Sequence, residues 1–397
     1  MKLHYNTFNC KKLKSNTCFI IISFVIILSG FSSCTNTKEF SVNQEKYLGN
    51  MKNPDDIYKT VESNKFYMPF DINIKAMERL MLVDFDGDTE YRTIELQIYD
   101  DNRGKGATVI LYGKDGKNDV YYTDSLFADG VLFREDLYEN KDMKYALNVS
   151  DLGLNSFLKM HDKSGRKIDM KIIEKKSKNK LISMLAPIGG GIKTFPFFPF
   201  FNMQEFNLVQ RSGTEIKVII DDIEYKPGKI PGLANGNFVY MARYATKPVI
   251  AQINTEYEGM LTVINFDEKD TYKFDDMNYH FVENNGHREL KKMTCSSYNR
   301  FVGITFSPPI PDIINLKNNI EINGKFSMES DSITGIVAGE YQINNNNNKI
   351  IITLQPVEAY SPIPGTVWVK AYEWNAEITV HSDKTVNMKS KWIKNFK

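Results

Sequence analysis

Four carboxylates in the first third of the chain have the spacing of a calcium-binding loop. Positions one, three, five and twelve of such a loop are Asp84, Asp86, Asp88 and Glu95. Ca²⁺ prefers hard oxygen ligands at alternate residues, closed by a glutamate that binds through both oxygens. Position six is Thr89, where the loop's sharp turn requires glycine, and the flanking residues are typical of strands. A hairpin with a solvated acidic tip explains the same residues, so both interpretations stay open.

A second candidate site is a row of aromatic and charged side chains near the end of the chain. If Val367–Ile378 is one strand, one of its faces carries Trp368, Lys370, Tyr372 and Trp374. Such a row suits stacking on sugar rings or lining a cavity for an apolar ligand. Core packing is the simpler explanation, because large aromatic residues commonly fill cores. The row is nevertheless the best ligand site that the sequence offers.

Phenylalanine is concentrated in a short proline-containing segment, residues 195–201 (FPFFPFF). Such a segment would make a costly apolar patch if it were exposed. It is therefore expected to be buried between two domains, to cover a pocket mouth, or to enter the acyl layer of a membrane. The interdomain position is the preferred interpretation.

Motifs for catalysis are missing from the sequence. Residues 189–194 (GGGIKT) lack the spacing of a phosphate-binding loop, and no serine lies in a nucleophile elbow. His280, His287 and Cys295 are too far apart for a zinc knuckle, and Cys295 fits a buried strand residue better than a nucleophile. We therefore predict no catalytic residues, and whether the protein is an enzyme stays open.

Short runs of β-branched and aromatic residues dominate the rest of the sequence. Runs such as MERLMLVDF, RTIELQIYD and ATVILYG are separated by hairpin punctuation such as DNRGKG and KDGKN. The same rhythm continues from residue 214 to the end, and residues 344–348, five asparagines, fit a hairpin loop. The pattern predicts an all-β protein of two antiparallel barrels or sandwiches, with a few short helices.

The predicted domain organisation has five parts. Residues 1–33 are a signal peptide, 34–70 a tether with a short helix near 55–64, and 71–180 a first β domain with a short helix at 151–160. Residues 181–206 are a Gly-, Pro- and Phe-rich connector, and 207–397 a second β domain. The succession of hairpins and the similar segments SGRKIDMKI and SGTEIKVII, one in each half, give the chain a faint resemblance to bacterial proteins built from two lipocalin-like barrels.

The beginning of the chain has the layout of a secretory signal peptide. Four lysines and no acid precede the apolar run Phe19–Leu28, which is too short to span a bilayer, and small residues follow it. The ending FSSC, Phe31–Cys34, resembles the lipobox of bacterial lipoprotein precursors. That resemblance implies that Cys34 is acylated and becomes the new N-terminus. Thr35 in place of aspartate implies the outer membrane, with periplasmic and surface exposure both open.

Composition excludes some partners. The chain has 50 Lys and Arg against 49 Asp and Glu, and the signal peptide removes four lysines, so the mature chain carries a net charge of −3. This near-neutral balance argues against nucleic acid, which requires a basic face. No cofactor is expected apart from the possible calcium ion. The membrane, reached through the acyl chains on Cys34, is the expected partner, and the oligomeric state is not indicated.

The sequence thus favours a lipid-anchored β-protein of the cell envelope that binds a carbohydrate or an apolar small molecule without catalysis. One alternative is an enzyme, either of the tandem lipocalin-like kind or a hydrolase whose carboxylates are scattered along the sequence. Another is a scaffold lipoprotein that has only protein partners.

Overall fold

The structure is a computed structural model that confirms the all-β prediction. It describes residues 57–59, 63–75, 77–101, 104–126, 137–176, 182–185, 197–230, 232, 238–266, 271–330, 336–347, 349–360, 368–383 and 385–394. No helix in these ranges reaches seven residues, and none could cross a membrane. The helical elements are 3-10 turns such as η3 (Ile313–Asn315) and η4 (Trp368–Ala371).

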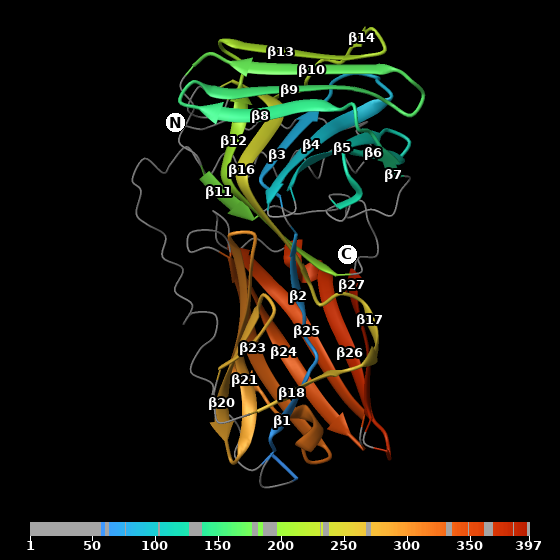
Figure 1. The fold of residues 1–397 in the computed structure, drawn as a ribbon. Helices are drawn as coiled ribbons and strands as arrows, with labels where there is room; N and C mark the ends of the chain where they lie inside the picture. Colours follow the sequence, from blue (N-terminus) through green and yellow to red (C-terminus); the bar gives the residue numbers. More distant parts are fainter. Residues whose placement is uncertain are drawn as a thin grey trace, which may run out of the picture.

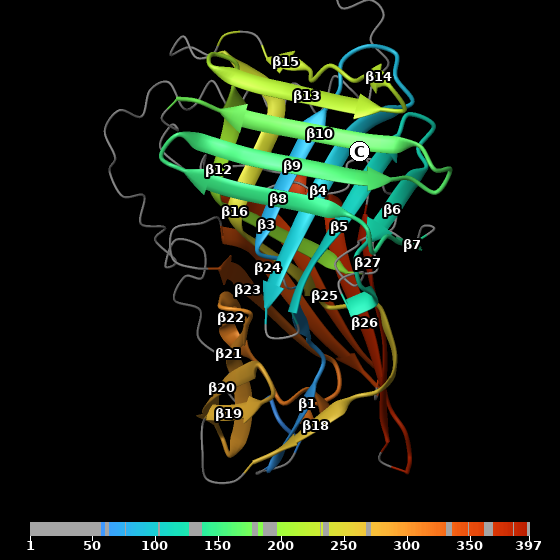
Figure 2. The same ribbon diagram turned by 45° about the horizontal axis from the view of Figure 1, so that its top comes forward.

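The upper unit in Figure 1 is a sandwich of two sheets. One sheet is formed mainly by β3 (Arg79–Asp84), β4 (Tyr91–Asp101), β5 (Gly104–Gly113), β6 (Asn118–Tyr122) and β7 (Leu137–Glu139), with β7 parallel to β6. The other consists of β8 (Lys144–Ser150), β9 (Gly153–His161), β10 (Lys167–Glu174), β13 (Thr214–Ile220) and β14 (Ile223–Glu224). Figure 2 shows the second sheet crossing the strands of the first at a steep angle, with one apolar core between them.

The lower unit is a ten-stranded antiparallel sheet that curls around its own core (Figure 1). Its strands are, in spatial order, β17 (Tyr257–Met260), β27 (Val386–Lys394), β26 (Tyr372–Val380), β25 (Lys349–Tyr360), β24 (Ile336–Asn346), β23 (Ile320–Ser330), β22 (Arg300–Ile310), β21 (His287–Ser297), β20 (Met277–Asn284) and β19 (Thr271–Phe274). From β19 to β27, strands that follow one another in sequence are also neighbours in the sheet. A series of hairpins produces this order.

Two long strands join the units. β12 (Phe198–Gln210) and β16 (Val239–Ile253) pair with each other along most of their length. The first half of β16 pairs with β3 in the sandwich and with the short β15 (Lys229–Ile230), while β11 (Ile182–Leu185) pairs with β12. The far ends of both long strands enter the core of the lower unit, where Phe198 and Ile253 are fully buried. The connection is therefore a continuous sheet with its own apolar cluster.

An N-terminal segment, described at residues 57–59 and 63–75, lies along the lower unit before the sandwich begins, and we call these residues the strap. It contains β1 (Lys65–Met68), which pairs with β18 (Thr262–Asn265), and β2 (Ile72–Lys75), which pairs with the end of β16. Its alternate residues Phe66, Met68, Phe70, Ile72 and Ile74 are all buried in the lower core. The inside of the curled sheet is thus filled by the protein's own side chains.

The domain organisation differs from the prediction. Strand β13 follows the predicted connector in sequence but pairs with β10 in the sandwich, and β16 then runs from the sandwich into the lower unit, so a boundary at 181–206 is wrong. Residues 65–75 belong to the lower unit, not to the sandwich that follows them. The predicted connector contains the strand β12, which holds one proline, Pro199. Pro199 pairs with Gln252 of β16, but β11 pairs with β12 only from Asn202 onward, so Pro199 lies at an edge position that a proline tolerates.

The predicted helices are also corrected. The described part of 55–64 holds an isolated bridge between Tyr58 and Leu316, and residues 151–160 form a turn followed by β9. In β9 the inner face carries Leu154, Ser156 and Leu158, and Ser156 satisfies its hydroxyl by donating to the Ala146 carbonyl at 2.8 Å. A polar residue at an inner position hides the alternation on which a strand prediction depends.

Candidate functional site

The four predicted calcium ligands do not meet in a loop. They lie on the β3–β4 hairpin, where Asp84 ends β3 and Glu95 lies in the middle of β4. The Asp84 carboxylate accepts a hydrogen bond from Arg243 Nη1 at 2.7 Å, and Asp88 pairs with Lys114 Nζ at 3.1 Å. Within the described ranges, no three His, Cys, Asp or Glu side chains are grouped so that they could hold a metal ion.

Glu95 instead belongs to a buried polar ladder on the face of β4 that points away from the sandwich core. Its Oε1 accepts from Gln97 Nε2 and its Oε2 accepts from the Tyr112 hydroxyl, both at 2.6 Å. Burial raises the pKa of the Glu95 carboxyl. Asp86, at the hairpin tip, accepts from the backbone N–H of Gly87 at 3.0 Å. The hairpin reading therefore accounts for the contacts that these side chains make.

The predicted aromatic row is interrupted at its start. Residues 368–371 form the 3-10 turn η4, and the strand β26 begins only at Tyr372. Trp368 and Lys370 thus lie in the turn, where the Lys370 side chain is exposed. Four residues of the row therefore do not share one strand face.

The two rings that do share a face of β26 point into the core. Tyr372 is 1% exposed and Trp374 is fully buried. The Tyr372 ring lies 5.3 Å from that of Phe198, and the Trp374 ring lies 5.5 Å from that of Phe70. An accessible ring row at these positions is wrong, because this face of β26 is the inner face of the curled sheet.

The phenylalanine-rich segment is buried in its described part. Phe198 and Phe200 lie in the lower core, and Phe201 lies in the separate apolar cluster along β12 and β16. The three rings are therefore buried, as the prediction requires, but Phe198 and Phe200 belong to the lower core itself and Phe201 to a cluster along the long strands. That the segment plugs an interdomain interface stays a prediction. Cys34 and its lipobox lie outside the described residues. Cys295 is a buried free cysteine on β21.

The outer face of the lower sheet is rich in amide groups, a feature that sequence reasoning did not single out. On β23–β26 the residues that point away from the core form two rows across the strands. One row is Glu321, Asn344, Ile351 and Glu377, and the next is Asn323, Gln342, Thr353 and Asn375. We call these eight residues the amide face. It lies on the same strands whose inner residues form the core.

Hydrogen bonds between side chains hold the amide face in place. Glu321 Oε1 accepts from Asn323 Nδ2 at 2.8 Å and from Gln342 Nε2 at 2.9 Å. Thr353 Oγ1 donates to Asn375 Oδ1 at 3.1 Å. Each amide has two donors and a carbonyl oxygen with two lone pairs, so these bonds leave further capacity for a ligand.

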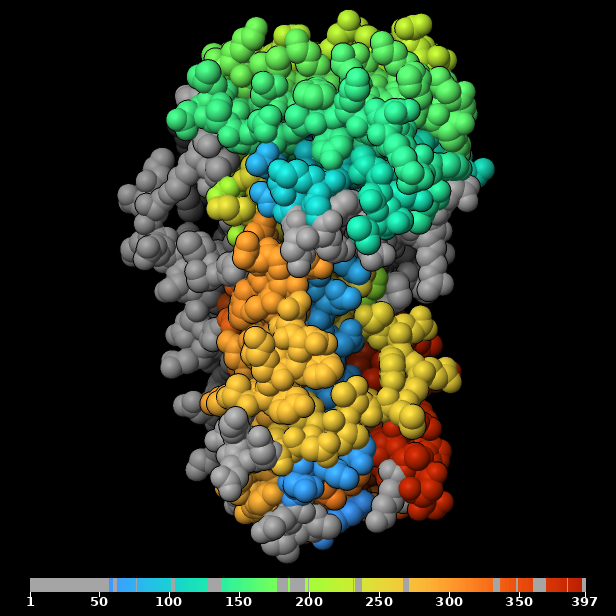
Figure 3. Space-filling view, in the orientation of Figure 1, coloured from blue at the N-terminus to red at the C-terminus, as the bar shows by residue number. Residues whose placement is uncertain are grey.

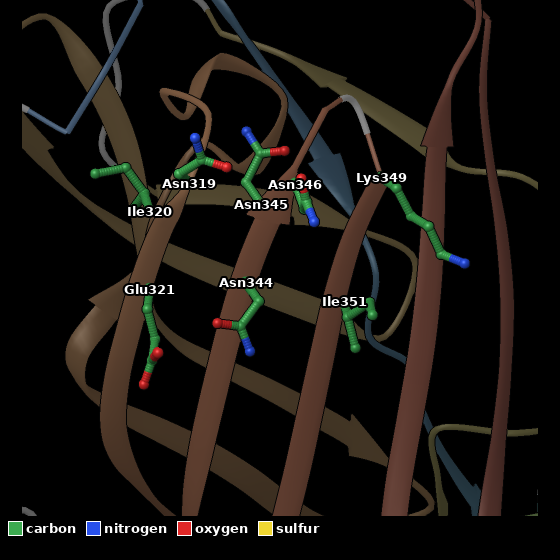
Figure 4. Close-up of a pocket in the computed structure, with 8 residues that line it drawn as sticks. All are labelled: Asn319, Ile320, Glu321, Asn344, Asn345, Asn346, Lys349 and Ile351. Carbon is green, nitrogen blue, oxygen red and sulfur yellow. The ribbon is translucent and has the colours of Figure 1, made fainter.

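One end of the amide face opens into a shallow depression of about 500 Å³ (Figure 4). It is lined by Asn319, Ile320, Glu321, Asn344, Asn345, Asn346, Lys349 and Ile351. Figure 4 shows Asn344 between Glu321 and Ile351, with Lys349 at the rim. Asn345 fixes the floor, because its amide donates to the carbonyls of Leu316 and Lys317 at 2.8 and 3.1 Å.

A buried polar cluster at the far end of the lower unit was also missed. Tyr58 donates to Glu289 Oε1 at 2.5 Å, and its ring stacks on that of His287 with centroids 3.8 Å apart. His287 Nδ1 lies 2.9 Å from Asp312 Oδ2. We call these four residues the Tyr58 cluster. They are at most 5% exposed, and burial raises the pKa of Glu289.

The Tyr58 cluster fastens the strap to the lower sheet. Backbone hydrogen bonds from Lys59 N to the Asn315 carbonyl and from Lys317 N to the Ile57 carbonyl flank it, at 2.7 and 2.8 Å. Tyr58 is separated from Glu289 by 231 residues, so only the fold brings these groups together. Because the cluster is buried and joins the strap to the lower sheet, we assign it a structural role in holding the strap in place.

No protein-family model matches this chain, and no curated protein is similar to it in sequence. The geometry of its own residues is therefore the basis for the function.

Proposed function

We propose that this protein is a lipid-anchored protein of the cell envelope that binds a carbohydrate, without catalysis, on the amide face and in the adjoining depression. The observation that carries the proposal is the pair of rows across β23–β26, which together carry the amides of Asn323, Gln342, Asn344 and Asn375. Their backbone is fixed by continuous antiparallel pairing, so a ligand would meet donors and acceptors already in place.

The chemistry of the amide face suits sugar hydroxyls. A hydroxyl group both donates and accepts, and each asparagine or glutamine amide offers both functions within one plane. The carboxylates of Glu321 and Glu377 add acceptors, and Lys349, which pairs with Glu377 at 2.8 Å, adds a donor. The exposed Ile351 offers an apolar contact beside them. The depression has the volume of a small-ligand site.

An apolar small molecule is less well supported than a carbohydrate. A barrel that binds such a ligand usually keeps a cavity inside, but here the strap and the ends of β12 and β16 fill the interior with side chains. The rings that would line such a cavity, Tyr372 and Trp374, already pack against Phe198 and Phe70.

Calorimetric titration with a panel of neutral and acidic oligosaccharides tests the binding site. Replacing both Asn344 and Gln342 by alanine should weaken binding by about 0.5–1.5 kcal/mol for each hydrogen bond lost. The folded state should change little, because both side chains lie on the outer face. Asn155→Ala, on the outer face of β9, is the matched control and should bind as the native chain does. Equal affinity of all three proteins, or no binding of any sugar, would refute the site.

Anchoring is tested separately. Cells that express the native chain and are fed a clickable palmitate should label it, and Cys34→Ala should abolish the label and leave the precursor uncleaved. Undiminished labelling of the alanine variant would overturn the lipid anchor while leaving the binding site untouched.

A further inference from the structure

The outer face of the five-stranded sheet in the upper unit carries a group of lysines. Residues such as Leu158 and Met170 point into the sandwich core, so the residues between them along each strand point outward. Five exposed outward residues of β8, β9, β10 and β13, or directly after β10, are lysines, and we call them the lysine face: Lys144, Lys159, Lys171, Lys175 and Lys217. In Figure 3 these strands, in green, form a continuous surface across the top of the molecule.

The carboxylates among these lysines are too few to neutralise them. Lys171 Nζ lies 2.8 Å from Glu215, and Lys159 Nζ lies 3.6 Å from Asp169. Further acids lie in the turns beside this sheet or on its edge strand β14: Asp142, Asp151, Asp221, Asp222 and Glu224. Within the described part of the chain, the three remaining members of the lysine face have no carboxylate at ion-pair distance: Lys144, Lys175 and Lys217. The middle of the face therefore carries excess positive charge.

This positive charge acts on a carboxylate of the face itself. The pKa of Glu215 is lowered, first by the hydrogen bond from Lys171 and then by the charges of Lys171, Lys175 and Lys217. An anionic group of a ligand placed among the same lysines would be stabilised in the same way.

An exposed aromatic ring lies among the lysines. Phe157 points outward from β9 and is 37% exposed. Lys171 of β10 is directly opposite it, and Lys217 of β13 is the next residue in the same row. Lys159 follows two positions along β9. A ligand on this face would therefore meet a flat apolar surface bordered by positive charges.

This combination suits a polysaccharide that carries anionic groups along its chain. The ring can stack against the C–H face of a sugar, while lysines on separate strands attract charges that repeat along a polymer. Lys144 on β8 and Lys217 on β13 are three strand spacings apart, which is about 14 Å. A single sugar is too small to reach both lysines, so the face requires several linked units.

Three other anionic partners fit this face less well. Protein interfaces are depleted in lysine and enriched in arginine and aromatic residues, whereas this face combines its lysines with a single ring. A single-stranded nucleic acid binds on a series of stacking rings. A membrane surface is bound by an apolar face that enters the lipid boundary, and the partly exposed Phe157 ring offers little to insert.

We propose that the lysine face is a second binding site, which takes a polysaccharide that carries carboxylate or sulfate groups. The polymer lies across β8, β9, β10 and β13, with its anionic groups near Lys144, Lys175 and Lys217 and one sugar ring on Phe157. This site is on the upper unit, and it does not depend on the amide face of the lower unit.

Calorimetric titration with polygalacturonate and with dextran sulfate tests the site, since one polymer carries carboxylates and the other carries sulfates. The native chain should bind at least one of them, with an affinity that falls as the salt concentration rises from about 0.05 to about 0.5 M. Replacing Lys144, Lys175 and Lys217 together by glutamine should weaken binding on the order of tenfold, because each exposed ion pair contributes modestly.

A matched control removes the same charge elsewhere. It replaces three exposed lysines of the lower unit by glutamine, Lys65, Lys273 and Lys291, and should bind within about twofold of the native chain. Phe157→Ala should weaken binding about fivefold, and Phe157→Tyr, which keeps the ring, should restore it. Lys144→Glu alone, on the edge strand β8, serves if the triple variant does not fold.

Three results would overturn the proposal. They are no binding of either polymer, an equal loss in the lower-unit control, and tighter binding of single-stranded DNA or of vesicles with anionic lipid than of both polymers. The double variant Asn344→Ala with Gln342→Ala should bind both polymers as the native chain does. A failure of the lysine face is thereby distinguished from a failure of the amide face.

Discussion

Replacing Tyr58 by phenylalanine should destabilise the protein in a pH-dependent way. The hydroxyl donates to Glu289 Oε1 at 2.5 Å, and Glu289 also accepts from Asn284 at 2.7 Å, inside a fully buried cluster. A hydrogen bond to an ionised partner contributes about 1.5–3 kcal/mol, whereas a neutral one contributes about 0.5–1.5 kcal/mol. We therefore expect the variant to lose about 2 kcal/mol of unfolding free energy where Glu289 is ionised, and less where it is protonated.

The direction of the pH dependence follows from the raised pKa of Glu289. A carboxyl whose pKa is raised in the folded state contributes stability that is complete below its unfolded pKa of about 4.3. That contribution is lost as the pH rises through the folded-state pKa. The Tyr58 hydroxyl stabilises the ionised form and limits this loss, so its removal costs most at high pH and least at low pH.

Urea unfolding of the native chain and of Tyr58→Phe at several pH values between 4 and 8 measures the difference. Tyr67→Phe, a half-buried tyrosine of the same strap, is the matched control and should stay within about 0.5 kcal/mol of the native chain. A cost for Tyr58→Phe that does not change with pH, or that stays below about 0.5 kcal/mol at pH 8, would refute the role assigned to its hydroxyl.

Two further predictions concern the residues singled out from the sequence. Trp374→Ala should cost about 3–5 kcal/mol of stability in urea melts, as large core truncations do. Asn375→Ala on the outer face should be nearly neutral. A near-neutral Trp374→Ala would contradict the position of this ring in the core. Millimolar Ca²⁺ should leave the melting temperature unchanged, because Asp84 is paired with Arg243 and Asp88 with Lys114. A rise in melting temperature that a chelator abolishes would show that the ion displaces these pairs.

The strands could be predicted because their signals, β-branched runs separated by turn residues, lie close together in the sequence. Turn residues between β-branched runs correctly predicted β3, β4 and β5. Of the asparagine run predicted as a hairpin loop, Asn344–Asn346 instead extend β24, and Asn347 lies in the turn that follows. The alternation along β26 also correctly placed Tyr372 and Trp374 on one face. Alternation cannot say which face is inward, because a shift by one residue exchanges the two sets. Here the packing of Phe70 and Phe198, far away in sequence, decides it.

Pairing between residues that lie far apart in the sequence could not be predicted from local patterns. The strap lies about 180 residues before its partner strand β16, and no local pattern in residues 65–75 reveals that the lower unit receives them. The Tyr58 cluster has the same origin, since His287, Glu289 and Asp312 become neighbours of Tyr58 only through the tertiary fold. Individually, these residues have no spacing that predicts a site.

One face of β23–β26 forms the core and the other lies outside, so residues of the proposed binding site can be replaced without disturbing the core. On β26, Trp374 and Ala376 are buried in the core, while Asn375 between them lies on the amide face. The core residues fix the position of the backbone, and the outer residues can be replaced without creating a cavity. A loss of binding in an outer-face variant with an unchanged melting curve can therefore be assigned to the ligand contact itself. This assignment requires that the hydrogen bonds on the outer face, such as that between Thr353 and Asn375, contribute little to folding stability. A lowered melting temperature of the same variants would show that they contribute substantially.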